Sequence, residues 1–218
     1  MDVSLETIVL WGVPVVFAIT LHEAAHGYVA KLFGDRTALM LGRVTLNPLK
    51  HIDPIGTLLV PGVLLATAWA SKSPPFIFGW AKPVPVNFAN LRNPKRDMVL
   101  VAAAGPGSNF LQGLAWAIVL VIAAPNGSFP SVALMEMAAI GFKVNLVLMA
   151  LNLLPLPPLD GGRVLAGLLP QNAAQPLMRV EPYGFFILIV LLATGLLDGL
   201  MRPLVRAAAW LISQIVGL

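Results

Sequence analysis

Residues 98–124 contain no charged side chain, and this run constrains the fold more than any other feature of the sequence. About 20 consecutive apolar residues suffice to cross the hydrocarbon core of a bilayer as a helix. In water, a helix that is apolar on all sides has to be buried on all sides. The run therefore predicts a membrane-spanning helix and a protein that lies in the bilayer.

The composition of the whole chain supports a polytopic membrane protein. Of the 218 residues, 58% are hydrophobic and only 11% are charged, against about 25% charged residues in ordinary soluble domains. The lack of cysteine excludes a disulfide scaffold and a thiolate zinc site. The net charge of +4 comes from short basic clusters beside apolar runs, which indicate cytoplasmic membrane flanks and not a nucleic-acid partner.

We expect an all-α bundle of about five to six transmembrane segments, in a single domain over residues 1–218 with a core at about 8–165. The further apolar runs are Thr7–Phe33, Ile55–Ala70, Val132–Leu154, Tyr183–Leu197 and, more weakly, Pro203–Leu218. Ile55–Ala70 is short and has basic residues on both flanks, which predicts a re-entrant segment or a tight hairpin. Residues 183–218 are expected at the periphery.

The charged flanks predict the orientation of the first span. Asp2 and Glu6 precede it, and a basic cluster follows it, made of Lys31, Arg36, Arg43 and Lys50. Positive flanks favour the cytoplasm, so the N-terminus is expected outside and the end of this span at the cytoplasmic side. The sequence thus predicts a multi-pass protein of the cell membrane, whether plasma membrane or bacterial inner membrane.

Two connecting stretches read as non-helical. Thr37–Leu46 shows a rough alternation that is compatible with a short strand or a surface loop. Lys82–Val86 contains Pro83 and Pro85, which exclude a helix there. Either stretch could pair edge to edge with an extended peptide.

His22, Glu23 and His26 give the sharpest chemical signal, an H-E-x-x-H pattern inside the first apolar run. Residues four apart share one face of a helix, so both imidazoles can reach a single ion. Glu23 is placed to take a proton from a metal-activated water. Ionisable groups inside a membrane span are costly and mark function by default. The competing interpretation is a polar helix end that meets the lipid headgroups.

A catalytic zinc site needs a third protein ligand, for which the sequence offers His51, Asp53, Glu136 and Asp160. Asp160 follows a proline-rich stretch and precedes Gly161 and Gly162, which allow a close approach of the backbone. Asp before Gly is also common in simple turns. The residues alone leave this choice open.

Taken together, these motifs resemble the site-2 protease family of intramembrane zinc metalloproteases in its compact prokaryotic form. The resemblance rests on His22–His26, on Gly105-Pro106-Gly107-Ser108-Asn109, on the stretch from Asn152 to Leu159-Asp160-Gly161 and on Gly79–Asn87. It covers about residues 8–165, with no room for an inserted PDZ or CBS module. The resemblance implies that His22, His26 and Asp160 hold one zinc ion per chain and that Glu23 is the general base.

The implied reaction is hydrolysis of peptide bonds within or near the transmembrane segments of membrane-protein substrates. Asn109 and Asn152 match asparagines expected near the active site, where they could bind an unwound substrate backbone or the developing oxyanion. Hydrogen bonding between helices would explain them equally well.

His51 and Asp53 could support the metal ligands from behind or form a polar patch at the membrane interface, which we favour. The expected partners are transmembrane substrates and bilayer lipid, with no nucleic acid, and a homo-oligomer is left open. The alternative function is a non-enzymatic metal-binding transporter or scaffold, whose histidines hold an ion for structural reasons.

Overall fold

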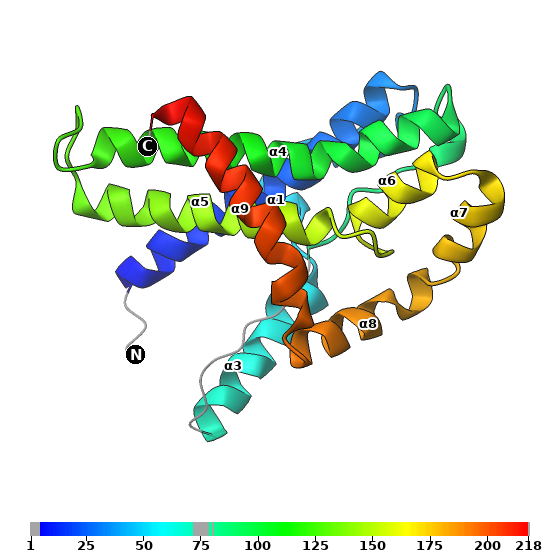
Figure 1. The fold of residues 1–218 in the computed structure, drawn as a ribbon. Coiled ribbons are helices and arrows are strands. Elements are labelled where there is room, and N and C mark those ends of the chain that lie inside the picture. The colour runs from blue at the N-terminus through cyan, green and yellow to red at the C-terminus, as the bar shows by residue number, and fades with distance from the viewer. Residues whose placement is uncertain (1–4, 72–78, 80, 218) are drawn as a thin grey trace.

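The computed structural model describes residues 5–71, 79 and 81–217, and the regular elements within these ranges are all helices (Figure 1). The predicted all-α fold is thereby confirmed for the described residues. Asp2 and Trp80, which the sequence interpretation used, lie outside them. In chain order the elements are α1 (Leu5–Leu32), α2 (Thr37–Met40), η1 (Pro48–Lys50), η2 (Pro54–Leu59), α3 (Val60–Ser71), η3 (Phe88–Asn90), α4 (Pro94–Ala123), α5 (Val132–Asn152), α6 (Asp160–Leu168), α7 (Gln171–Met178), α8 (Glu181–Ala193) and α9 (Leu196–Val216).

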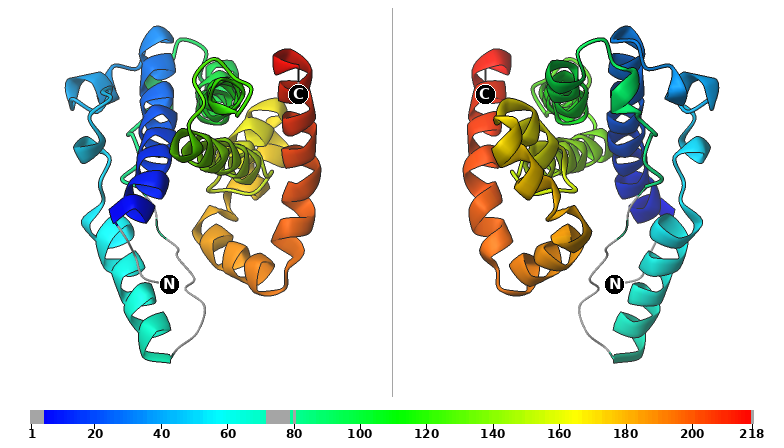
Figure 2. Two further views of the ribbon diagram at one scale, coloured as in Figure 1. Left: turned by 90° about the vertical axis from the view of Figure 1, so that its left-hand side faces the viewer. Right: turned by 90° about the vertical axis from the view of Figure 1, so that its right-hand side faces the viewer.

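The helices α4 and α5 form an antiparallel pair at the centre of the molecule (Figure 1). Helix α1 packs on one side of this pair and α9 on the other, so the helices form three layers (Figure 2). The short helix α6 returns along α4. This arrangement brings the start of α6 toward the middle of α1, although the two are far apart in the sequence.

Three of the described helices are long and apolar enough to cross a membrane, namely α1 from Glu6 onward, α4 and α5. Helices α7 and α8 would qualify as a fourth span together, but they are bent by 64° at the break between them. The predicted count of five to six spans is therefore not confirmed. With 13 residues, α8 alone reaches about 20 Å at about 1.5 Å per residue, less than the ~30 Å hydrocarbon core. Helix α9 carries Asp198, Arg202 and Arg206.

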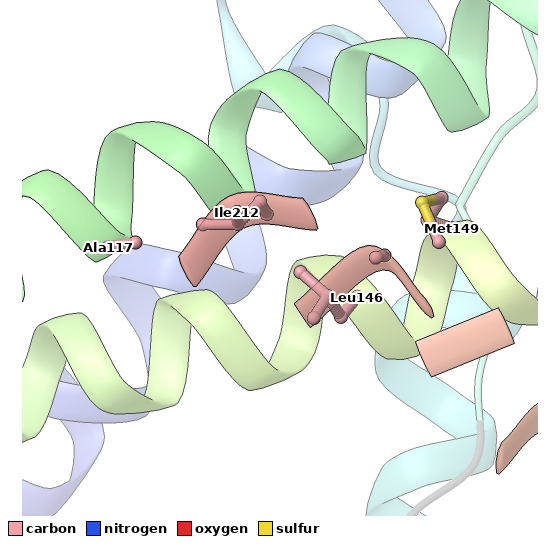
Figure 3. Packing of buried hydrophobic residues seen from close by; sticks show 5 residues of the cluster. Ala117, Leu146, Met149 and Ile212 are labelled. Atoms are coloured by element: carbon pink, nitrogen blue, oxygen red, sulfur yellow. The ribbon is translucent and has the colours of Figure 1, made fainter. Parts of the chain in front are cut away.

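One face of α9 completes the hydrophobic core. Ala208 and Ile212 of α9 are buried in a cluster with Ala117, Leu146 and Met149 (Figure 3). Gly113 allows the close packing of α4 and α5, because a Cβ atom at this position would lie 2.6 Å from Leu146 Cδ1. The C-terminal helix, expected at the periphery, thus adds two fully covered side chains to the centre.

Residues 37–46 do not form a strand, which was one of the two structures expected for them. Thr37–Met40 is the short helix α2, and turns and bends follow it. The cause is local, since Asp35 Oδ1 accepts hydrogen bonds from the Thr37 hydroxyl and from its main-chain N–H, at 3.0 Å for the latter. Such side-chain bonds favour a turn over extended backbone. By contrast, residues 81–87 contain no helix, as the prolines predicted.

Candidate metal centre

The first part of the candidate site lies on one face of α1. His22 and His26 are one helical turn apart, and their Nε2 atoms lie 3.1 Å from each other. Their rings meet edge to face, with 4.7 Å between the ring centres. The i, i+4 spacing therefore brings both imidazoles to one point, as the sequence pattern predicted.

Asp160 reaches the same point from the first turn of α6. Its Oδ2 atom lies 3.3 Å from Nε2 of His22 and 3.3 Å from Nε2 of His26. Gly161 makes this possible, because a Cβ atom there would lie 2.4 Å from the main-chain oxygens of Leu153 and Leu154. The paired glycines thus let α6 begin directly against the turn that ends α5.

The three atoms fit a metal ion. In a tetrahedral zinc site with bonds of about 2.0–2.1 Å, neighbouring ligand atoms lie about 3.3 Å apart, close to the observed 3.1, 3.3 and 3.3 Å. Asp160 Oδ2 is buried and has no hydrogen-bond partner, which suits an atom that faces a cation. Among the described residues, His22, His26 and Asp160 are the one group of at least three His, Asp or Glu side chains that could hold a metal ion.

The charge state of Asp160 also suits a cation ligand. Burial would raise the pKa of this carboxyl, but the neighbouring imidazoles of His22 and His26 favour its charged form and lower the pKa to about 2. Asp160 is therefore a carboxylate at neutral pH. An anionic oxygen beside two imidazole nitrogens needs positive charge between them, from an ion or from protons.

Hydrogen bonds at the far side of each imidazole orient the two rings. His22 Nδ1 lies 2.6 Å from Asn109 Oδ1, and His26 Nδ1 lies 2.8 Å from the main-chain oxygen of Val101. Both oxygens are acceptors, so each Nδ1 carries the proton and each Nε2 of a neutral ring keeps its lone pair for a metal. The helix α4 thus sets the tautomer of both histidines.

Gly105 explains how α4 comes so close to the imidazoles. A Cβ atom at this position would lie 2.4 Å from His26 Nε2 and 2.6 Å from His22 Nε2. Any side chain here would enter the space between the ligand atoms. The Gly105–Asn109 motif therefore has two effects within about one helical turn. Gly105 leaves space for the ligand atoms, and Asn109 hydrogen-bonds to His22.

Comparisons with known proteins show the family of this chain. The protein described as “Putative zinc metalloprotease YwhC”, from Bacillus subtilis (strain 168), is 39% identical to this chain over 199 residues, which is 89% of this chain and 85% of that protein. The model of peptidase family M50 matches residues 119–195, a range that includes Asp160. The chain belongs to peptidase family M50. It is thus a member of the site-2 protease family that its motifs resemble.

More distant M50 relatives are longer than this chain. Rip2 of Mycolicibacterium smegmatis, described in the same words as YwhC, is 30% identical over 181 residues, which is 83% of this chain and 65% of that protein. Rip2 of Mycobacterium tuberculosis (strain H37Rv) is 29% identical over 184 residues, 84% of this chain and 66% of that protein. No solved structure matches this chain.

In this M50 chain, Glu23 lies beside the three candidate ligands but faces a different neighbour. Its Oε2 atom accepts a hydrogen bond of 2.7 Å from the main-chain N–H of Val84. Val84 belongs to the proline-containing stretch between α3 and α4. One oxygen of the expected general base is thus already held by the backbone of a distant segment.

Asn145 lies next to the candidate site in this M50 chain, and the sequence interpretation missed it. Its Oδ1 accepts a hydrogen bond of 2.9 Å from Asn109 Nδ2, which also donates to the Ala18 carbonyl at 3.2 Å. Asn145 in turn donates to the Gly141 carbonyl, and both asparagines are fully buried. A polar amide in the middle of an apolar span was the available signal.

Other predicted M50 site residues have different surroundings. The Asn152 amide donates to the Leu148 carbonyl of its own helix at 3.0 Å. His51 is buried, with Nε2 3.0 Å from the Thr45 carbonyl oxygen. Asp53 accepts hydrogen bonds from the main-chain N–H groups of Ile55 and Gly56, so it caps the helix η2. The structure brings Asn109 to the histidines, and it gives these three residues partners of their own.

Proposed function

We propose that this chain is a zinc-dependent intramembrane endopeptidase in which His22, His26 and Asp160 hold one zinc ion. One observation carries this proposal. Three ligand atoms, two from α1 and one from α6, lie 3.1–3.3 Å from one another. The substrate class is peptide bonds within or near the transmembrane segments of other membrane proteins. This substrate class follows from the site-2 protease family and from the position of His22 and His26 in a candidate span.

Zinc, when bound, supplies a Lewis acid that polarises the scissile carbonyl and lowers the pKa of an attacking water. Glu23 then accepts the proton that this water loses as its oxygen attacks the carbonyl carbon. The same carboxyl passes the proton to the leaving nitrogen when the C–N bond breaks. Water is thereby added across one peptide bond, and Glu23 returns to its starting state.

The asparagines have separate roles in this proposal. Asn109 orients His22 through its Oδ1 and does not itself contact substrate, because its Oδ1 and Nδ2 atoms already have protein partners. Asn152 stays a candidate for binding an unwound substrate backbone near the start of α6. A helical substrate has to unwind locally, because its carbonyls are otherwise occupied by its own hydrogen bonds.

The number of ligands favours an enzyme over the alternative transporter or scaffold. A structural zinc site normally has four protein ligands, whereas a catalytic site has three and keeps one position for water. The described residues offer three.

The proposal also includes a single membrane-embedded domain, an outside N-terminus and an active site toward the cytoplasmic side of the cell membrane. Whether the chain forms a homo-oligomer stays open.

The test is Glu23→Gln in purified protein with a panel of single-span membrane substrates. Glutamine keeps the size of the side chain but cannot accept the proton. We expect cleavage to fall by at least about 100-fold, since general acid–base catalysis contributes about 10²–10⁴-fold. Zinc content, measured by elemental analysis, should stay at one ion per chain in both proteins.

The matched control is Asp160→Asn, which should lose both zinc and cleavage. If Glu23→Gln cleaves as fast as wild type, Glu23 is not the base. If Asp160→Asn binds zinc with unchanged affinity, the third ligand lies elsewhere. If wild type binds zinc tightly but cleaves none of the substrates, the scaffold alternative gains support.

A further inference from the structure

We propose that the stretch Lys82–Asn87, here called the bracket, positions the general base through its backbone. The inference rests on the proposed role of Glu23 and adds a new element to it. In this view the Val84 main-chain N–H holds one carboxylate oxygen of Glu23 at a fixed place. The other oxygen is then left to exchange the proton with water and the leaving nitrogen.

The bracket contacts α1 at the level of the candidate site. The Val84 N–H donates to Glu23 Oε2 at 2.7 Å, and the Val84 side chain is buried. Gly27, one turn beyond Glu23, makes room for it, because a Cβ atom at Gly27 would lie 3.1 Å from Val84 Cγ1. Main chain and side chain of Val84 therefore both lie against the face of α1 that carries Glu23.

The bracket is anchored on both sides of Val84. On the N-terminal side, Arg43 Nη2 donates to the carbonyl oxygens of Lys82 at 2.7 Å and Pro83 at 3.3 Å, and the Lys82 N–H donates to the His51 carbonyl at 2.9 Å. On the C-terminal side, the Asn87 N–H donates to Asp35 Oδ2 at 2.8 Å. Arg43 and Asp35 are themselves buried.

These anchors argue for a fixed support. A buried guanidinium whose Nη2 atom binds two consecutive carbonyls favours one position of the chain, since the planar group is rigid and its donors have fixed directions. Breaking it free would leave a buried charge without its partners, which is costly. A lid that opens in each catalytic cycle would not be expected to depend on such contacts.

The prolines argue against a direct role of the bracket as a template for substrate. Pairing with an added strand needs a row of free N–H and C=O groups, and prolines blunt such an edge. Pro83 and Pro85 have no N–H, which leaves Lys82, Val84 and Val86 as the donors between residues 82 and 86. Two of these three already bind His51 and Glu23. The sequence suggested that Pro83–Val86 could pair with an unwound substrate. The contacts of this stretch favour a different role, and we do not propose that pairing.

The hydrogen bond from Val84 to Glu23 matters for catalysis because it limits the positions that the carboxylate can adopt. A carboxylate on a helix can adopt several rotamers, and catalytic groups act well only when neighbouring contacts hold them near the productive geometry. A misplacement of about 1 Å can cost on the order of 100-fold in rate. The bracket would hold Glu23 without occupying the ligand atoms of His22, His26 and Asp160.

The test compares Val84→Pro with Val84→Ala in the full-length purified protein. Proline removes the N–H that binds Glu23 and also changes the side chain, whereas alanine keeps the N–H and only shortens the side chain. We expect kcat to fall about 10- to 100-fold in Val84→Pro, with KM and zinc content unchanged. Val84→Ala keeps the N–H and should therefore lose clearly less kcat than Val84→Pro, and an equal loss would overturn the proposal. Unchanged or increased kcat in Val84→Pro would overturn the proposal, and an increase would indicate a plug that covers Glu23.

A second pair of variants keeps the proposal testable if Val84→Pro does not fold. Arg43→Gln removes the charged fork from Lys82 and Pro83, and Arg43→Lys restores a cation that can bind one carbonyl. We expect kcat to fall in Arg43→Gln and to recover in part in Arg43→Lys, with zinc content equal in both. Wild-type kcat in Arg43→Gln would overturn the bracket. Failure of the proposed function itself is distinguishable, because then wild type would not cleave or Glu23→Gln would cleave normally.

Discussion

At the scale of single residues, Gly105 is the position where the smallest change should have the largest effect on the metal site. A Cβ atom there would lie 2.4 Å from His26 Nε2, whereas nothing lies within 4 Å of a Cβ atom at Gly107. The two glycines are two residues apart on the same helix. Substitution of each glycine in turn therefore distinguishes two effects. Only a side chain at Gly105 would block the metal site, whereas both substitutions remove a glycine from the helix.

We predict that Gly105→Ala loses most of its bound zinc, while Gly107→Ala keeps it. The added methyl group would push the imidazoles apart, because contacts below 3 Å require the rings, or the helices that carry them, to shift. Zinc content and competition with a chromogenic chelator would measure the difference. Equal zinc affinity in the two variants would mean that the packing of α4 on the histidines is looser than the structure indicates.

Asp35 ties the end of α1 to the bracket and makes a pH-dependent contribution to stability. Burial raises the pKa of this carboxyl, but hydrogen bonds from Thr37, Asn87 and Asn90 outweigh burial and lower the pKa. A lowered pKa in the folded state means that the stabilisation is present above the unfolded value of about 3.9. It is lost as the pH falls through the lower, folded-state value.

We predict that Asp35→Asn destabilises the protein at neutral pH by about 1–3 kcal/mol, because the side chain loses its charge and one of the two oxygens that accept from Thr37, Asn87 and Asn90. The difference in unfolding free energy between wild type and variant should begin to shrink below about pH 4, where the unfolded wild type takes up a proton, and should be smallest below the lower, folded-state pKa. Denaturation in detergent at several pH values would measure it. A constant difference from pH 7 to pH 3 would contradict the proposed role of the carboxylate charge.

Much of the candidate site could be predicted at the residue scale. The spacing of His22 and His26 was enough to suggest a metal centre, whereas Asp160 as the third ligand followed from the resemblance to the site-2 protease family and not from the residues alone. The partners of the imidazoles were harder to find. The Val101 acceptor is a main-chain oxygen, which no side-chain pattern reveals, and Asn145 contacts Asn109 only because α4 and α5 pack closely at that point.

At the scale of helices, the packing of α9 shows that the hydrophobic core extends to the C-terminal part of the chain. Ile212 is 1% exposed and packs against α4 and α5, whereas its neighbour Leu211 is 47% exposed. We predict that Ile212→Ala destabilises the protein by about 2–5 kcal/mol through the cavity that it leaves. Leu211→Ala should have much less effect, and thermal unfolding in detergent would compare them. Equal melting temperatures would mean that α9 does not pack on the bundle.

Some helices were hard to predict from the sequence, because packing and hydrogen bonds to other segments decide where they form. The uncharged run at 98–124 needed no context. Helix α9 did, because its apolar face is defined by α4 and α5 and its other face carries charges that weaken a hydropathy signal. Thr37–Met40 is similar, since a hydrogen-bonding Asp35 decides between turn and strand where the intrinsic preference is weak.

At the scale of the whole molecule, the orientation in the membrane is the prediction that remains to be measured. The chain has no cysteine, so single cysteines can be introduced without background. We predict that Ser128→Cys, in the turn between α4 and α5, reacts with an impermeant maleimide in intact cells. Lys50→Cys, after α1, should react only once the membrane is permeabilised. The reverse pattern would invert the proposed orientation, because both positions are exposed on the protein.

The candidate ligands also have a consequence for the biosynthesis of the protein. His22 and His26 are made early, whereas Asp160 follows after α4 and α5 have been synthesised. A partly inserted chain thus has the two imidazoles but lacks the carboxylate that completes the cluster. On the proposed function, hydrolysis would become possible only once α6 has packed against α4 and brought Asp160 to the two imidazoles.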